Sequence, residues 1–299
     1  MASLVTTQML KLSNTKVLHL EPTDVCQASC PLCARETELS FDKSQHNHLT
    51  VETIHQLVGE KTVKNLDKMF MCGDYGDPAA GKHTLDIFKY FRSVNTNITL
   101  GMNSNGAIQN ASWWQTLGDM FNKQNDYVVF SIDGLKDTNH IYRRGVVWDK
   151  LIENAQAYIA TGASAHWDML VYEHNQHQVD ACEHLARDLG FTWFRAKVSK
   201  RVSNVDWLNP PKGWNDPVVS TGRIECFVEK EQSVYITAKG SLRPCCWHGY
   251  ADGVELSGFN SLKESWDTDA CNKICKETCT KTENKTSFMS QWQRNTALC

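Results

Sequence analysis

Short apolar runs alternate with longer segments of helical periodicity from residue 16 to about residue 197. Alternating or continuous apolar runs of this length predict strands, and they are KVLHLEP (16–22), KMFMCG (68–73), NITLGMNSNG (97–106), YVVFSIDG (127–134), SAHWDMLVYEHN (164–175) and FTWFRAK (191–197). Apolar residues three and four apart predict helices over 50–66, 82–94, 111–123, 148–162 and 176–190. Thr50 is the expected N-cap of the first of these helices.

This strict alternation predicts an α/β fold whose strands are parallel, because each helix carries the chain back to start the next strand. About six β/α units are fewer than the eight of a closed barrel. We therefore expect a partial (β/α)6 TIM-like barrel over residues 16–197, after an N-terminal extension at 1–15.

Residues 198–299 differ in pattern and predict a small C-terminal module with a tail. Pro210, Pro211, Gly213 and Pro217 indicate a linker. The run SVYITAKGSLRPCC (233–246) predicts a β-hairpin that turns at AKG, and residues 261–279 predict a helix that ends in cysteines.

Composition and charge narrow the class of protein. The chain has 299 residues, of which 41% are hydrophobic and 22% charged, as in soluble globular proteins. A net charge of -3 gives no basic field, so we expect no nucleic-acid partner. No apolar run approaches the ~20 residues of a membrane span and no secretory signal is visible, which predicts a cytoplasmic protein without membrane contact.

The 12 cysteines are clustered. In a reducing compartment clustered cysteines indicate metal or redox chemistry more than disulfides. Cys26, Cys30 and Cys33 follow the first strand, and six more cysteines lie between residues 226 and 279. This partition predicts two metal centres.

The loops after the predicted strands carry the other unusual residues. These loops are CGDYGDP (72–78), NSNG (103–106), SIDG (131–134) and YEHN (172–175). In parallel α/β folds the chemistry gathers at the carboxyl ends of the strands.

Three thiolates on one loop would leave one iron of a [4Fe-4S] cluster open, since such a cluster normally takes four cysteines. An open iron can bind a small molecule. The spacing C-x3-C-x2-C at Cys26, Cys30 and Cys33, with Leu32 where an aromatic is usual, resembles the motif of radical S-adenosylmethionine (SAM) enzymes. In that family SAM binds the open iron.

The resemblance extends over residues 16–197 and implies SAM contacts at four strand ends. Gly76-Asp77-Pro78 is similar to the motif that holds the SAM amino group, with Asp in place of the usual Glu. Ser104 and Asn105 match the third-strand motif, and Ser131 and Asp133 match the one linked to the ribose. Arg143 is the counterpart of an arginine that reaches the SAM carboxylate, with Arg144 as a rival.

The later cysteines resemble the auxiliary-cluster extension called SPASM, or its shorter twitch form. The resemblance implies one auxiliary [4Fe-4S] cluster held by Cys226, Cys245, Cys275 and Cys279, with Cys246 and Cys271 as reserves. A zinc ion held by thiolates, with or without His248, is the alternative.

Other assignments of single residues also stay open. Zinc could be held by the first three cysteines with His46 or His48. Cys72 and Cys182 are expected to be buried small hydrophobes, and Cys299 an accident of the terminus.

The resemblance implies an oxidoreductase-type radical enzyme. It would cleave SAM reductively to a 5′-deoxyadenosyl radical that abstracts hydrogen from a peptide or a small molecule. Flavodoxin or ferredoxin is the implied reductant. Dehydrogenation of a small metabolite is the alternative activity. A non-catalytic zinc or iron–sulfur protein is the rival class, and the SAM-contact motifs argue against it.

Overall fold

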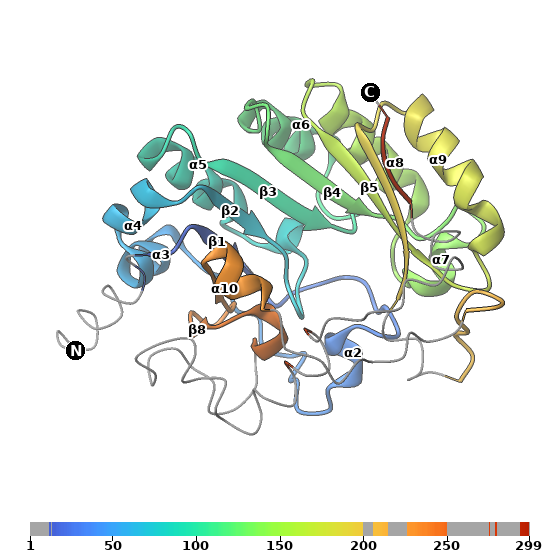
Figure 1. Ribbon diagram of the computed structural model, residues 1–299, viewed down its shortest axis with the longest axis horizontal. Coiled ribbons are helices and arrows are strands. Elements are labelled where there is room, and N and C mark those ends of the chain that lie inside the picture. The colour runs from blue at the N-terminus through green and yellow to red at the C-terminus, as the bar shows by residue number, and fades with distance from the viewer. Residues whose placement is uncertain are drawn as a thin grey trace. The chain divides into compact units, whose positions relative to one another are not determined.

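A computed structural model describes residues 12, 14–199, 206–214, 226–249, 275, 279 and 294–298. Its strands are β1 (Val17–Leu20), β2 (Lys68–Met71), β3 (Thr99–Ser104), β4 (Tyr127–Ser131), β5 (Ala165–Val171), β6 (Trp193–Val198), β7 (Ser233–Ile236), β8 (Leu242–Arg243) and β9 (Arg294–Ala297) (Figure 1). The strand and helix alternation expected from the sequence is confirmed for each of β1 to β6.

Helices connect these strands. They are α2 (Ala34–Thr37), α3 (Val51–Val58), α4 (Glu60–Asn65), α5 (Thr84–Val94), α6 (Ala111–Met120), α7 (Asn139–Tyr142), α8 (Trp148–Ile159), α9 (Val179–Asp188) and α10 (Phe227–Glu231), with short 3-10 turns η1 (Pro78–Ala80), η2 (Gln176–Gln178) and η4 (Cys246–His248). The helix predicted over 50–66 is two helices, because the chain turns at Gly59 with a φ of 74°. Its predicted N-cap is confirmed, since Thr50 Oγ1 accepts a hydrogen bond of 3.1 Å from the Thr53 amide.

The described residues fall into two compact units. The first comprises those within 1–25, 45–100 and 218–284, and the second those within 26–44, 101–217 and 285–299. In the first unit β1 pairs in parallel with β2 on one side and with β7 on the other. The predicted hairpin is confirmed: β7 pairs with β8 antiparallel, and Gly240 in its turn has a φ of 78°. The hairpin thus extends the sheet of β1.

In the second unit β4 pairs in parallel with β3 from Gly101 onward and with β5, and β5 pairs in parallel with β6. The edge of β6 is covered by β9, which is antiparallel (Figure 1). Trp167 and Phe194 are fully buried on the face that carries α8 and α9. Alternate residues of β5 and β6 point the other way and are half-buried, which gives the unit an apolar face and a polar face.

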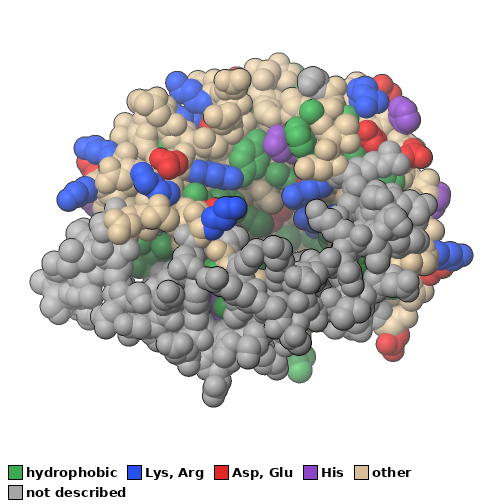
Figure 2. Space-filling view, in the orientation of Figure 1, with side chains coloured by type: hydrophobic (Ala, Val, Ile, Leu, Met, Phe, Trp, Pro, Cys, Tyr) green, Lys and Arg blue, Asp and Glu red, His purple; other side chains and the backbone are tan. Residues whose placement is uncertain are grey.

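The predicted boundary between residues 197 and 198 stays a prediction. Residues on both sides of it contribute strands to each unit, because β7 pairs with β1 and β9 pairs with β6. None of the helices in the described ranges is long and apolar enough to cross a membrane. On the face shown in Figure 2, the Lys and Arg side chains of the described residues lie among acidic and uncharged ones.

Candidate functional site

The loop after β1 holds its three cysteines in different environments. Cys30 is buried, whereas Cys26 and Cys33 are half-buried. The loop folds back on itself, since the Cys33 amide donates to the Cys30 carbonyl at 3.0 Å and the Ala28 amide to Cys26 Sγ at 3.4 Å. The Ser29 amide donates to the Arg144 carbonyl at 2.9 Å, which ties the loop to the segment after α7.

A glycine permits this close approach. A Cβ at Gly145, whose φ is 83°, would lie 2.8 Å from the Gln27 carbonyl oxygen. A larger residue there would push the cysteine loop away from the segment that carries Arg143 and Arg144.

Asn105, predicted from the third strand end, lies against the cysteine loop. Its side-chain amide and that of Gln27 exchange hydrogen bonds of 2.8 and 3.2 Å. Its Nδ2 is also 3.7 Å from Cys26 Sγ. Asn105 therefore contacts the first cysteine from the end of β3.

Asp133 and Arg143, also predicted, form a buried ion pair. Arg143 Nε donates to Asp133 Oδ2 at 2.6 Å, and the side chains are 16% and 0% exposed. The other carboxylate oxygen accepts from the Leu170 amide at 2.6 Å. The guanidinium reaches the cysteine loop as well, with Nη1 at 4.0 Å from Cys30 Sγ. Arg144, the rival, instead lies over the Trp207 ring at 4.6 Å.

Burial and the Arg143 charge act in opposite directions on both acidic groups of this cluster. Burial raises the pKa of the Asp133 carboxyl and that of the Cys30 thiol, while the nearby guanidinium lowers each pKa. Arg143 therefore stabilises the thiolate form of Cys30, which is the form that binds iron.

The predicted Gly76-Asp77-Pro78 segment lies in the first unit. Asp77 Oδ1 accepts a hydrogen bond of 2.9 Å from the Ala79 amide, so the side chain is used to cap η1. A Cβ at Gly76 would lie 1.8 Å from the Thr23 carbonyl oxygen, which explains why only glycine fits there. The segment is held by Glu21, which is fully buried and whose Oε1 accepts from the amides of Tyr75 at 2.7 Å and Gly76 at 3.2 Å.

The two predicted serines differ in setting. Ser104 is buried and its Oγ accepts from the Gly106 amide at 3.0 Å, so it shapes the turn after β3. Ser131 is half-buried at the end of β4 and lies in register with Asp168 on β5.

Five of the predicted auxiliary-region cysteines are described, all in the first unit. Cys275 is buried, whereas Cys226, Cys245, Cys246 and Cys279 are half-buried. His248 is also buried, and its Nε2 is 3.5 Å from Cys275 Sγ. Cys271 and Cys299 lie outside the described residues.

None of the ten cysteines in the described ranges forms a disulfide. Within the same ranges, no three Cys, His, Asp or Glu side chains are grouped as they would be around a metal ion. The donor chemistry of the first loop still fits a [4Fe-4S] cluster, because three thiols share one loop and a buried cation faces one of them. Cys182 is buried, as expected, whereas Cys72 is half-buried. Desolvation raises the pKa of each thiol, to about 12 for Cys182.

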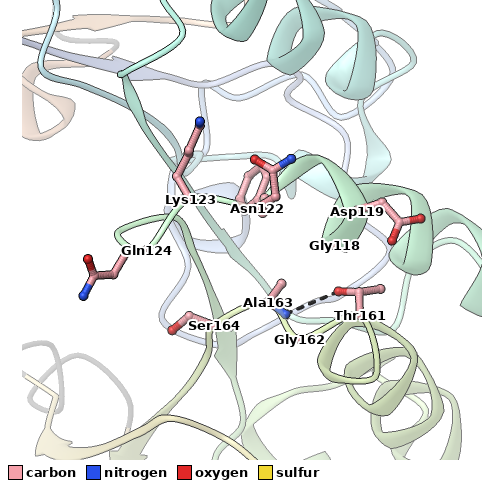
Figure 3. Close-up of a pocket in the computed structure, with 10 residues that line it drawn as sticks. Gly118, Asp119, Asn122, Lys123, Gln124, Thr161, Gly162, Ala163 and Ser164 are labelled. Atoms are coloured by element: carbon pink, nitrogen blue, oxygen red, sulfur yellow. Dashed lines mark hydrogen bonds between the residues drawn. The ribbon is translucent and has the colours of Figure 1, made fainter.

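A pocket of about 440 Å³ lies elsewhere in the second unit, between the loop that precedes β4 and the loop that precedes β5 (Figure 3). Gly118, Lys123, Gly162 and Ser164 are among its lining residues. It contains none of the predicted site residues, which follow the strands instead of preceding them.

Sequence reasoning missed several residues of the site. Gln27 and Glu21 carry no motif signal, since their roles depend on partners 78 and 54 residues away. Asp168, Arg195 and Lys197 could have been noticed, because charged side chains interrupt otherwise apolar strands.

No protein-family model matches the chain, and no curated protein sequence matches it. Solved structures match its fold. SuiB of Streptococcus suis bound to S-adenosylmethionine has a TM-score of 0.62 at 13% identity, over 88% of this chain and 68% of that chain. SuiB bound to the precursor peptide SuiA has a TM-score of 0.61 at 15% identity, over 96% and 72% of the two chains.

The protein anSMEcpe, solved with bound AdoMet and the Cp18Cys peptide, has a TM-score of 0.62 at 14% identity, over 95% of this chain and 90% of that chain. At these identities the likeness concerns the fold. The chain has the mixed α/β fold, with mostly parallel strands, of proteins that have been solved with S-adenosylmethionine bound.

Proposed function

We propose that this protein is a radical SAM enzyme. The observation that carries the proposal is the convergence of three predicted elements on one loop. Asn105 contacts Cys26, Arg143 contacts Cys30, and Asp133 holds Arg143 in place. The segments that follow β3 and β4 thus meet at the three-cysteine motif, in a fold shared with SAM-bound proteins.

Cys26, Cys30 and Cys33 would hold a [4Fe-4S] cluster and leave one iron for SAM. When bound, the cluster would supply the electron for the reductive cleavage of SAM to methionine and a 5′-deoxyadenosyl radical, the species that would take a hydrogen atom from the substrate. Asp133 fixes the Arg143 guanidinium beside Cys30. From there Arg143 would bind the SAM carboxylate, while Gly76, Asp77 and Pro78 would bind the amino group through their backbone.

The finer features of the family belong to the same proposal. Strands β1 to β6 would form a partial barrel, and the segment from Cys226 onward a twitch-like module with an auxiliary [4Fe-4S] cluster. SuiB and anSMEcpe, which share the fold, were each solved with a bound peptide, and this favours a peptide substrate over a small metabolite. An oxidoreductase outcome, flavodoxin or ferredoxin as reductant, and a cytoplasmic location stay predictions.

Zinc is a second candidate for the auxiliary centre, and one contact favours it. His248 Nε2 lies 3.5 Å from Cys275 Sγ, and both side chains are buried. An imidazole together with thiolates is a ligand set that zinc accepts. Metal analysis separates the two candidates.

The central experiment is anaerobic reconstitution with iron and sulfide, followed by dithionite and SAM. We expect wild-type protein to form 5′-deoxyadenosine. The triple variant Cys26→Ala/Cys30→Ala/Cys33→Ala should lose about four irons and form none. Cys182→Ala is the matched control, because this cysteine is buried on α9 and belongs to neither predicted ligand set. Formation of 5′-deoxyadenosine by the triple variant would disprove the proposal.

The auxiliary ligands need their own test. With two clusters the wild-type protein should bind about eight irons. Cys275→Ala and Cys279→Ala should each lose or destabilise the second cluster, whereas Cys246→Ala and Cys271→Ala should retain it. About four irons plus one zinc in wild-type protein would show that the auxiliary centre is a zinc site.

A further inference from the structure

The half-buried face of the second unit carries an ordered set of side chains in rows across its strands. In register, Val129 of β4 pairs with His166 of β5, and His166 pairs with Trp193 of β6. One row nearer to the carboxyl ends of the strands, Ser131 pairs with Asp168, and Asp168 with Arg195. The next row places Lys197 opposite Leu170.

The charged side chains of these last two rows form ion pairs with one another. Arg195 Nε donates to Asp168 Oδ1 at 2.8 Å, and its Nη2 donates to Asp168 Oδ2. Lys197 Nζ lies 3.5 Å from the same Oδ2. Asp168 thus holds two cations with one carboxylate, which leaves one positive charge in excess.

Both cations remain open to a ligand. The Arg195 and Lys197 side chains are 42% and 43% exposed, whereas the Asp168 side chain is 14% exposed. The Asp168 carboxylate is therefore shielded from solvent, whereas the guanidinium and ammonium groups that contact it reach the solvent. Arg195 uses the Nε–Nη2 side of its guanidinium group for Asp168, so its remaining N–H groups and the Lys197 ammonium group are the donors that a carboxylate could bind.

The charged rows adjoin the proposed SAM site. Ser131, a predicted ribose contact, is the register partner of Asp168. The Leu170 amide, in the row of Lys197, donates to Asp133, which holds Arg143. A substrate that presents a carbon atom to SAM above Ser131 would also lie beside Arg195 and Lys197.

We propose that Arg195 and Lys197 form a recognition site for an acidic side chain of a peptide substrate, with Asp168 as the residue that positions Arg195. This inference rests on the proposed function for its location. A peptide fits the surface better than a single small anion does. The stacked rings of Tyr127 and His166, whose centroids are 5.2 Å apart, lie toward the amino ends of the strands. These rings offer apolar contacts to neighbouring residues of the same peptide.

The test is a selection that requires no knowledge of the natural substrate. A library of random 12-residue peptides, displayed on ribosomes, is selected for binding to anaerobically purified full-length protein in the presence of SAM. We expect Asp or Glu to be enriched at one fixed position. A synthetic copy of the best peptide should bind at least tenfold more tightly than its counterpart with Asn or Gln at that position.

Variants of Lys197 test whether this residue discriminates between the acidic peptide and its amide counterpart. Lys197→Gln should bind the acidic peptide and its amide counterpart equally, and Lys197→Arg should restore the preference. Lys150→Gln is the charge-matched control, because Lys150 is exposed on α8. Retained discrimination in Lys197→Gln, selected peptides without an acidic position, or failure to select any peptide would overturn the inference.

The proposed function is tested separately, by measuring whether the wild-type protein forms 5′-deoxyadenosine in the absence of peptide. If no 5′-deoxyadenosine forms but Lys197-dependent discrimination is found, the radical SAM proposal fails and the recognition site stands. If 5′-deoxyadenosine forms without acidic discrimination, the recognition site fails alone.

Discussion

Removal of Arg143 should destabilise the protein strongly, because it leaves a buried carboxylate without its cation. The Asp133 side chain is fully buried and that of Arg143 is 16% exposed. Breaking a buried ion pair by removing one partner costs roughly 3–5 kcal/mol. Arg143→Ala should therefore lose about 3–5 kcal/mol of unfolding free energy at neutral pH, measured by urea denaturation followed by circular dichroism.

The loss of unfolding free energy in Arg143→Ala should be smaller at acidic pH than at neutral pH. Burial raises the pKa of Asp133 and Arg143 lowers it, so removal of Arg143 leaves that pKa higher still in the folded variant. The folded variant then takes up a proton on Asp133 as the pH falls, which removes the buried charge. The difference between wild type and variant is thus greatest above the folded pKa of Asp133 in the variant and smallest below its folded pKa in the wild type.

Two further variants test whether Asp133 and Arg143 form a buried, coupled pair. Arg144→Ala removes the neighbouring arginine, which is exposed and lies over the Trp207 ring, and should cost only about 0.5–1 kcal/mol. In the double variant Asp133→Asn/Arg143→Ala the loss should be less than the sum of the two single losses, since no charge stays buried. A loss of less than about 1 kcal/mol in Arg143→Ala, or one that is unchanged between neutral and acidic pH, would show that the pair is not a buried, coupled one.

Three further predictions concern the scaffold. Thr50→Ala should cost about 1 kcal/mol in urea denaturation because it removes the N-cap of α3, whereas Thr116→Ala, in the exposed middle of α6, should cost less. Glu21→Ala should lose roughly 2–6 kcal/mol because it leaves the Tyr75 and Gly76 amides without their buried acceptor, and a markedly smaller loss in Glu21→Gln would identify the lost acceptor as the cause. Burial lowers the pKa of His19 to about 4 from 6.5, so the unfolded chain binds the proton first and stability should fall as the pH drops from 6.5 toward 4. His19→Gln should be less sensitive to this range, and an NMR titration that finds a His19 pKa near 6.5 would contradict the assignment.

The secondary-structure elements and the candidate chemistry could be predicted from local sequence patterns. Alternation of apolar residues located β1 to β6 and the helices between them, and Thr50 marked a helix start that the structure confirms. The three-cysteine loop and the residues after the strands were visible as short motifs. The break at Gly59 was missed because helical periodicity continues on both sides of a single residue with positive φ.

Which of these residues come into contact depends on long-range pairing that local patterns do not encode. The edge of a strand can form hydrogen bonds with any other strand, however far apart the two lie in sequence. The pairing of β7 with β1 and of β9 with β6 therefore leaves no local signal. The contacts of Gln27 with Asn105 and of Arg143 with Cys30 join positions 78 and 113 residues apart. The Asp168–Arg195 pair depends on the register between β5 and β6, because a shift of one residue would place Arg195 among the buried side chains beneath α9.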